Sequence, residues 1–397
     1  LNKSLTFSQV QQNQLLQTGV TNVMKPSLIR LSKSVVGERE AKAVSEVILN
    51  DGYLGMGKEV KRFEERLELM FNRHCIAVNS GTAALHLAIE SIIQPGDEVL
   101  VPSITYVATY QAVTAAGGIP ISCDVIHRDM SIDLCDAKSK ITSKTRVIVP
   151  VFYSGSGRCL DSIEAFAKQH DLRVVYDAAH AFGSSQGGQL IGRVGDVFCF
   201  SFDGIKNITC GEGGAVVTQD DNIASYCRDA RLLGVKNDTQ ARYEGKRSWA
   251  FDVHGPGYRY HMSNINAAIG NVQLDRFKDF AIQRQRLAEE YVNLLQNKKY
   301  ISLLDIDFTD TVPHIFAIVL DKNVDRDEIK RKMLEKGVET GVHYFANHKL
   351  SRFKTDNNNC KVAEQIHTQL LSLPLHPELN EESLSYVVHQ LIELLGD

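Results

Sequence analysis

The sequence predicts an α/β protein with a mainly parallel sheet, and three observations support this class. Between residues 75 and 218, short runs of apolar and β-branched residues alternate with segments of helical periodicity, as expected when helices connect parallel strands. The apolar runs are nearly continuous, which is typical of strands that are buried on both faces. After Met262 the pattern changes to long helical periodicity and then returns to mixed structure, which indicates a second, smaller α+β domain.

Seven runs are expected to form the large sheet. They cover residues 76–79, 98–102, 119–124, 146–152, 172–177, 197–202 and 214–218, with helices expected at 82–93, 106–116, 160–170 and 222–233. A long helical segment from residue 265 to about 295 would join the two domains. In the small domain, a strand is expected at 314–320, a helix at 326–336, and a last helix that ends near Leu395.

The length of 397 residues exceeds the usual size of a single hydrophobic core. We expect a large domain at 24–285 and a small C-terminal domain at 286–397. Residues 1–23 are rich in Gln, Asn, Ser and Thr and precede Met24, so we interpret them as an N-terminal extension of non-native origin. A native arm that takes part in oligomer contacts is the alternative.

Composition excludes several classes of partner. The net charge of -4 gives no general attraction to nucleic acid or to anionic membranes. No apolar stretch is long enough to span a bilayer, and the first residues lack the order of a signal peptide. The eight cysteines are scattered without a C-x-x-C pair, so reduced thiols are expected rather than a metal site. The sequence predicts a cytoplasmic protein that binds neither nucleic acid nor membrane.

Three segments carry residues that could bind or react with a ligand. In the first, Asn79-Ser80-Gly81-Thr82 follows a predicted strand and opens a helix, where free backbone N–H groups could hold a phosphate. An ordinary helix cap is the alternative. In the second, Asp177 ends an apolar strand and His180 follows. In the third, Ser201 ends a strand, and a loop beside a glycine-rich bend carries Lys206.

Together these segments supply what a pyridoxal phosphate (PLP) site needs. Lys206 offers an amine for a Schiff base, Asp177 a carboxylate that keeps the pyridine nitrogen protonated, and the turn at Gly81 a phosphate site. Tyr106, which also follows a strand, could stack on the cofactor ring. For Tyr106 and His180 alone, a place in the core is the more common role.

The residues from about 28 to the C-terminus resemble the DegT/DnrJ type of sugar aminotransferases, within the aspartate aminotransferase fold (fold type I) of PLP enzymes. The resemblance rests on these motifs: Gly55-Met56-Gly57, Phe63-Glu64, Asn79 to Leu85, Gly96-Asp97-Glu98-Val99, Pro102-Ser103, Asp177-Ala178-Ala179-His180, Ser201 to Lys206, Gly211 to Gly214, Asn264 to Gly270 and His343-Tyr344. It implies that Lys206 forms the Schiff base and that Asp177 contacts the pyridine nitrogen. The other implied contacts are with the phosphate (Gly81, Thr82 and Ser201), the cofactor ring (Tyr106 and His180) and the sugar nucleotide (His343 and Tyr344).

One segment departs from the family pattern. The family commonly supplies an Asn from the neighbouring subunit to the cofactor phosphate, whereas the corresponding segment here runs from Gly257 to Met262 without Asn. Arg259 or His261 could donate instead, and arginine is a good phosphate ligand. The resemblance still implies a homodimer with shared active sites.

The resemblance implies transfer of an amino group from L-glutamate to a nucleotide-linked keto-6-deoxyhexose, with PLP and its pyridoxamine form alternating. The sequences of residues 202–209 and 257–264 resemble members that act on dTDP-linked sugars, so we expect a dTDP-linked substrate that is aminated at C3 or C4. The product would be an amino sugar for surface polysaccharides or glycosylated products. Two alternatives are a PLP-dependent sugar dehydratase and a non-catalytic regulatory homologue of the same fold. The dehydratases usually have His in place of the lysine. A dinucleotide-binding oxidoreductase is disfavoured because no G-x-G-x-x-G opens a helix.

Overall fold

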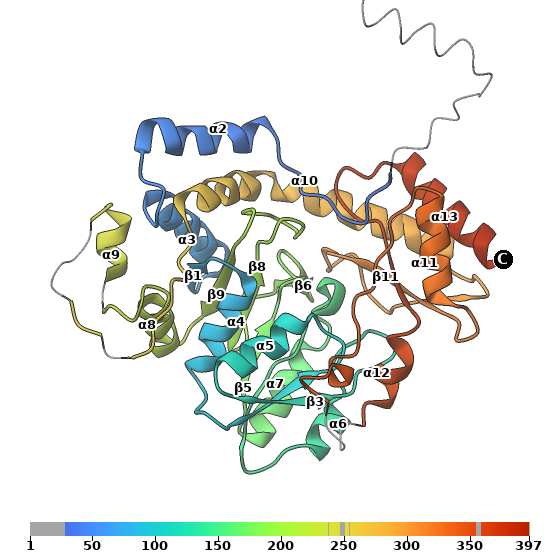
Figure 1. The fold of residues 1–397 in the computed structure, drawn as a ribbon, viewed down its shortest axis with the longest axis horizontal. Coiled ribbons are helices and arrows are strands. Elements are labelled where there is room, and N and C mark those ends of the chain that lie inside the picture. The colour runs from blue at the N-terminus through green and yellow to red at the C-terminus, as the bar shows by residue number, and fades with distance from the viewer. Residues whose placement is uncertain (1–27, 237, 247–250, 254, 355–358, 397) are drawn as a thin grey trace, which may run out of the picture.

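The computed structural model describes residues 28–236, 238–246, 251–253, 255–354 and 359–396. Figure 1 shows a large sheet flanked by helices, with a second group of helices and strands that follows the long helix α10. The extension expected at residues 1–23 lies outside the described residues.

All seven runs expected as strands form one sheet. Its strands are β1 (His74–Val78), β2 (Glu98–Pro102), β3 (Ile119–Cys123), β4 (Thr145–Ile148), β5 (Arg173–Asp177), β8 (Val197–Ser201) and β9 (Gly214–Thr218). They are arranged in the order β1-β9-β8-β5-β4-β2-β3. The pairings of β9 are antiparallel and the other four are parallel, which confirms a mainly parallel seven-stranded sheet.

Alternate side chains of the buried strands pack against helices on opposite faces. On one face lie α4 (Gly81–Glu90), α5 (Val107–Ala115) and α8 (Asp221–Ala230). On the other lie α3 (Lys58–Phe71), α7 (Leu160–His170) and the first turns of α10 (Asn264–Leu295). With both faces covered, the strands show continuous apolar runs rather than alternation.

The small sheet was predicted only in part. Strand β11 (Phe316–Leu320) lies between β10 (Ile301–Leu303) and β12 (Leu370–Leu373), and both pairings are antiparallel. The C-terminal half of α10, together with α11 (Arg326–Glu335) and α13 (Glu381–Leu395), shares an apolar core with this sheet. The boundary predicted between residues 285 and 286 falls within α10, and the division into two domains stays a prediction.

Several short elements complete the described part of the chain. They are α2 (Glu38–Glu46), η1 (Val47–Asp51), α6 (Leu134–Ser139), η2 (Tyr153–Gly155), β6 (Ser185–Gln186), β7 (Gln189–Leu190), α9 (Asp238–Tyr243), η3 (Asn347–Lys349) and α12 (Lys361–Ile366). The run predicted at 146–152 ends as a strand at Ile148. Pro150 has no N–H to donate, and an isolated bridge between Val151 and Asp177 continues the pairing. Over the described ranges, no helix has both the length and the apolar character needed to cross a membrane.

Candidate active site

The predicted site residues meet at one edge of the large sheet. Asp177 is the last residue of β5, Ser201 is the last residue of β8, and the loop after β8 carries Lys206. Because β5 and β8 are parallel neighbours, their carboxyl ends lie side by side, which is where ligands bind in open α/β sheets.

Lys206 lies at the centre of this edge. The residue keeps some exposed surface, and the surrounding protein lowers the pKa of its amine to about 8 by desolvation. The nearby carboxylates of Asp177 and Asp203 oppose this shift. The lowered pKa leaves roughly a tenth of the amine neutral at pH 7, far more than for an ordinary lysine, and a neutral amine is the form that can act as a nucleophile or a base.

Asp177 is a buried carboxylate. Burial raises its pKa, and three contacts act in the opposite direction: the Thr109 hydroxyl, the Ala179 N–H and the charge of Lys206. Thr109 Oγ1 donates to Asp177 Oδ2 at 2.7 Å, and the Ala179 N–H donates to Oδ1 at 3.2 Å. These donors favour the ionised carboxylate, which is the form that pairs with a protonated ring nitrogen.

The turn before α4 has the features of an anion site. Ser80 caps the helix: its Oγ accepts from the Ala83 N–H and its carbonyl from the Ala84 N–H. Among the described residues, this leaves the N–H groups of Gly81 and Thr82 at the positive end of the helix available to a phosphate. A Cβ at Gly81 would lie 2.7 Å from Ser201 Cβ, so glycine lets the end of β8 approach this turn.

The aromatic residues form a chain of contacts that ends at Lys206. The Tyr106 and Tyr344 rings lie 5.8 Å apart, and the Tyr344 hydroxyl is 2.8 Å from His180 Nε2. The His180 ring lies 4.6 Å from the ring of His314, whose Nε2 is 3.3 Å from Lys206 Nζ. Tyr106 remains 60% exposed, so its ring face is open to a ligand. The structure thus brings Tyr106, His180 and Tyr344 together with Lys206.

His343 contacts this chain of rings from the side of β12: its ring lies 4.9 Å from the ring of Tyr344. Its Nδ1 is 2.8 Å from the Ser372 hydroxyl on β12, and its carbonyl accepts from the Tyr153 hydroxyl. Burial lowers the pKa of His343 to about 4, which keeps the ring neutral. Its neighbour Tyr344 supplies the hydrogen bond to His180.

The segment that carries Arg259 and His261 lies beside the anion site. His261 forms an isolated antiparallel bridge with Val78, and the Asn79 side chain donates to the Arg259 carbonyl at 3.3 Å. The Arg259 residue is exposed, and the contact described here is through its backbone. Burial and the guanidinium groups of Arg259, Arg231 and Arg242 lower the pKa of His261, so this ring is the weaker phosphate ligand of the two.

Two residues of the site were missed by the sequence analysis. Thr109 lies in the first turn of α5, 68 residues before its partner Asp177, and His314 lies 108 residues after Lys206. A threonine in a helical pattern and a histidine at a strand start carry no local signal of such contacts. Only the fold reveals them.

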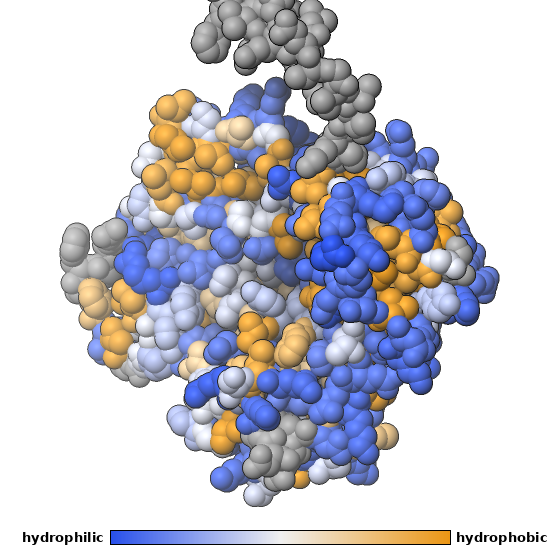
Figure 2. Space-filling model, turned by 45° about the vertical axis from the view of Figure 1, so that its right-hand side comes forward, coloured by the Kyte–Doolittle hydropathy of each residue, from blue (hydrophilic) through white to orange (hydrophobic). Residues whose placement is uncertain are grey.

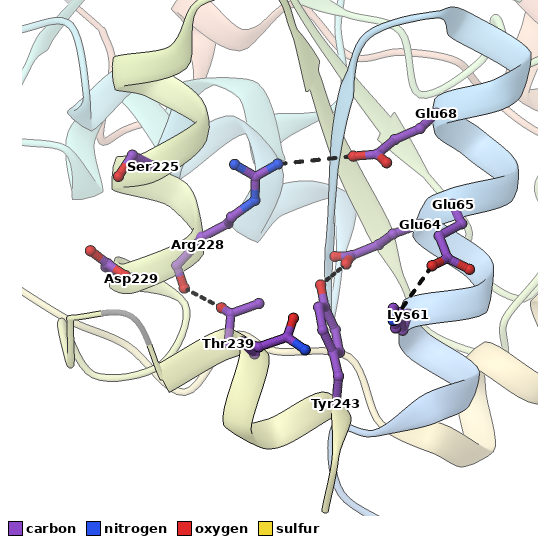
Figure 3. Close-up of a pocket in the computed structure, with 10 residues that line it drawn as sticks. Lys61, Glu64, Glu65, Glu68, Ser225, Arg228, Asp229, Thr239 and Tyr243 are labelled. Atoms are coloured by element: carbon purple, nitrogen blue, oxygen red, sulfur yellow. Dashed lines mark hydrogen bonds and ion pairs between the residues drawn. The ribbon is translucent and has the colours of Figure 1, made fainter. Parts of the chain in front are cut away.

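A separate polar groove lies between α3, α8 and α9. Its volume is about 410 Å³, and the lining residues are Lys61, Glu64, Glu65, Glu68, Ser225, Arg228, Asp229, Thr239, Gln240 and Tyr243. Figure 3 shows Arg228 directed toward Glu68 and Tyr243 toward Glu64. None of the site residues predicted from the sequence lines this groove.

The residues at the edge of the sheet fit PLP. Lys206 provides an amine of lowered pKa, and Asp177 a buried carboxylate held by donors. The start of α4 provides N–H groups that have no partner in the described part of the chain and lie beside Ser201. In addition, His180 Nδ1 is buried without a hydrogen-bond partner among the described residues, as expected of a polar atom that faces a ligand.

The sequence matches the DegT/DnrJ/EryC1/StrS aminotransferase family over residues 35–392. PseC from Helicobacter pylori, an aminotransferase involved in the biosynthesis of pseudoaminic acid, is 25% identical, with a TM-score of 0.85 over 92% of this chain and 99% of that one. The sugar aminotransferase CalS13 from Micromonospora echinospora is 27% identical, with a TM-score of 0.83 over 92% and 100%. The PLP form of Spr1654 from Streptococcus pneumoniae is 26% identical, with a TM-score of 0.80 over 92% and 97%.

These similarities extend over nearly the whole chain and include a protein solved in its PLP form. They confirm the predicted fold type I, the aminotransferase class and PLP as the cofactor. The chain belongs to the DegT/DnrJ/EryC1/StrS aminotransferase family.

Proposed function

We propose that the protein transfers the amino group of L-glutamate to a dTDP-linked keto-6-deoxyhexose, at C3 or C4 of the sugar. The observation that carries the proposal is the presence of Lys206 and Asp177 at the same edge of the sheet: an amine of lowered pKa interacts electrostatically with a buried, hydrogen-bonded carboxylate. When bound, PLP supplies an electron sink for the carbanion formed during transamination.

Each residue of the site has a part in this scheme. Lys206 would hold the cofactor, and its amine would take the proton from the amino-bearing carbon of the donor. Asp177 keeps the ring nitrogen protonated through its negative charge. The N–H groups of Gly81 and Thr82, with the Ser201 hydroxyl, bind the phosphate.

The remaining residues orient the cofactor ring and the sugar nucleotide. Tyr106 would stack on the ring face, and His180, held by the Tyr344 hydroxyl at 2.8 Å, would contact the ring. Tyr344 and His343 line the sugar side. The lowered pKa of His180, caused by burial first and by Lys206 and His343 next, keeps this imidazole neutral. A neutral His180 can therefore orient the cofactor without repelling a protonated ring nitrogen.

We further propose a homodimer in which Arg259 of one copy contacts the cofactor phosphate of the other. The exposed position of Arg259 beside the anion site supports a role outside its own chain. Exposed apolar residues are also consistent with a second copy: Ile48 and Leu49 of η1 are 50% and 77% exposed, and Leu54 is 47% exposed. Figure 2 shows apolar patches among hydrophilic residues on the surface.

The sugar substrate is supported by the relatives and by sequence. CalS13 is a sugar aminotransferase, and PseC takes part in the biosynthesis of pseudoaminic acid. Residues 202–209 and 257–264 resemble members that act on dTDP-linked 6-deoxyhexoses. The product would be an amino sugar for surface polysaccharide or a glycosylated product, made in the cytoplasm. Lys206 argues against the sugar dehydratases, which usually have His at this position.

A two-step spectroscopic experiment tests the proposal. Purified protein with bound PLP is mixed with L-glutamate, and the visible absorbance of the cofactor should fall as 2-oxoglutarate forms. A panel of dTDP-, UDP- and GDP-linked keto sugars is then added; the dTDP-linked 6-deoxyhexose should restore the absorbance and yield a C3 or C4 amino sugar. If glutamate leaves the absorbance unchanged, the protein is a binder. If a sugar is consumed without gaining nitrogen, it is a dehydratase.

A further inference from the structure

The Asp177 carboxylate depends on a hydroxyl that belongs to a different element. Thr109 has no exposed surface, and its Oγ1 lies 2.7 Å from Asp177 Oδ2, 2.9 Å from Thr105 Oγ1 and 3.2 Å from the Tyr106 carbonyl. A threonine in a helix commonly bonds the carbonyl three or four residues earlier. Here the contact with the carboxylate is the shortest of the three, so the local bond does not account for the geometry.

The direction of these hydrogen bonds follows from the charge of Asp177. An ionised carboxylate can only accept, and a hydroxyl has one proton to donate. The Thr109 proton therefore goes to Asp177, which means that Thr105 donates to Thr109. Thr105 is itself fixed, because the Asn347 amide of η3 donates to the Thr105 carbonyl at 2.6 Å. As long as Asp177 is ionised, the hydrogen bonds run in one direction, from Thr105 to Thr109 and from Thr109 to Asp177.

Besides its hydrogen bonds, the charge of Lys206 stabilises the Asp177 carboxylate. The titratable groups that face it or its neighbour Lys206 are Lys206, Cys199, Tyr344, Asp203, His180, His314, His343 and Arg284. Burial raises the pKa values of the Cys199 thiol and the Tyr344 phenol, so both are neutral. In the described part of the chain, two donors reach the carboxylate, Thr109 and the Ala179 N–H, and the Thr109 contact is the shorter.

We infer that Thr109 is a positioning residue of the reaction: its hydroxyl, oriented by Thr105, keeps Asp177 ionised and directed toward the nitrogen of the cofactor ring. The inference rests on the role of Asp177 in the proposed function. Without the hydroxyl, the carboxyl group binds its proton at higher pH, and a protonated Asp177 no longer keeps the ring nitrogen charged.

Two variants of the PLP-bound enzyme separate this role from simple packing. Thr109→Val keeps the shape and removes the hydroxyl, whereas Thr109→Ser keeps the hydroxyl. At neutral pH we expect Thr109→Val to lower kcat by roughly 10- to 100-fold, the factor that corresponds to one hydrogen bond to a charged group. The acidic limb of its pH profile should move to higher pH. Thr109→Ser should retain the wild-type profile. An equal loss at every pH would overturn the inference.

A second readout uses the full chain without cofactor and does not depend on activity. Asp177 has a raised pKa in the folded state, so its ionisation costs stability; this cost is absent below the unfolded pKa and complete above the folded pKa. Thr109→Val increases the cost, so its deficit in Tm should shrink as the pH is lowered from neutral. In an Asp177→Asn background, which has no charge to support, the deficit and its pH dependence should largely vanish.

The outcomes distinguish this inference from the proposed function. The same deficit in both backgrounds, without pH dependence, contradicts the inference even if the enzyme is a transaminase. Conversely, wild-type protein that does not respond to glutamate contradicts the proposed function. The comparison of Tm values in the wild-type and Asp177→Asn backgrounds still tests the hydrogen bond between Thr109 and Asp177. If Thr109→Val fails to fold, Thr105→Val takes its place: it removes the donor to Thr109, and an unshifted acidic limb in that variant would contradict the inference.

Discussion

The two halves of the candidate site differ in how completely one chain builds them. The inner half (Asp177, His180 and Ser201) is buried, and Asp177 and His180 have hydrogen-bond partners within the same chain. The outer half (Tyr106 and Arg259) is exposed, and Arg259 accepts a hydrogen bond from Asn79 through its backbone carbonyl.

This difference indicates that the buried residues take part in the reaction and the exposed residues bind the ligands. A buried carboxylate and an amine of lowered pKa require a fixed environment, because an unpaired buried charge is costly. Exposed side chains can bind a sugar nucleotide or a neighbouring copy without such constraints. We therefore expect changes in the inner half to affect the chemical step, and changes in the outer half to affect affinity.

The largest effect is expected at Lys206. Lys206→Ala removes the amine that holds the cofactor and moves the proton, so turnover should fall by roughly 10⁴-fold or more. PLP should still bind non-covalently through the phosphate site. Stopped-flow absorbance with glutamate measures the half-reaction. The matched control is Lys140→Ala, which removes a lysine that is hydrogen-bonded to Asp136. Full activity of the Lys206 variant with added PLP would refute the assignment.

Asp177→Asn should have the next largest effect. The amide keeps the shape but has no negative charge to hold the ring nitrogen protonated, so kcat should fall by about 10²- to 10³-fold, the cost of removing one preorganised electrostatic contact. Steady-state kinetics at several pH values check this. A variant with a changed KM but an unchanged kcat would place Asp177 in substrate binding instead.

Arg259→Ala should weaken affinity more than it slows chemistry. Loss of a charge-assisted bond to the phosphate should raise the Kd for PLP by roughly 10- to 100-fold, while kcat at saturating PLP stays near the wild-type value. Equilibrium titration of the cofactor-free protein measures this. His261→Gln is the matched control, and a larger effect of that change than of Arg259→Ala would exchange the roles of the two residues.

The smallest effect is expected at Tyr106. Tyr106→Leu keeps apolar area but removes the aromatic face, and offset stacking is worth about 0.5–1.5 kcal/mol, so PLP affinity should fall by roughly 2- to 10-fold. Tyr106→Phe should behave like wild type in the same titration. Equal losses in both variants would mean that the hydroxyl, and not the ring, makes the contact.

The sequence predicted the large sheet better than the small one for a physical reason. Strands buried on both faces have continuous apolar runs, so β2 and β9 coincide with the predicted ranges. The three residues of β10 and the four of β12 are too short for a periodic signal. Their position is set by pairing with β11.

The site divides in the same way. Lys206 and Asp177 were predicted because Asp177 ends a strand and Lys206 follows one, at the edge where ligands bind. Thr109 and His314 were not predicted, because each acts through a partner that is distant in sequence. The resemblance to a family can locate residues in recognisable motifs, but a contact between α5 and β5 follows from the packing of the folded chain.

The most direct test of the account is to locate the lysine that holds the cofactor. Protein loaded with PLP is reduced with borohydride and digested, and the peptides that carry the phosphopyridoxyl group are identified by mass spectrometry. We expect the modification on Lys206, with strong loss of labelling after addition of glutamate. Modification of another lysine, or no covalent attachment in active protein, would contradict it.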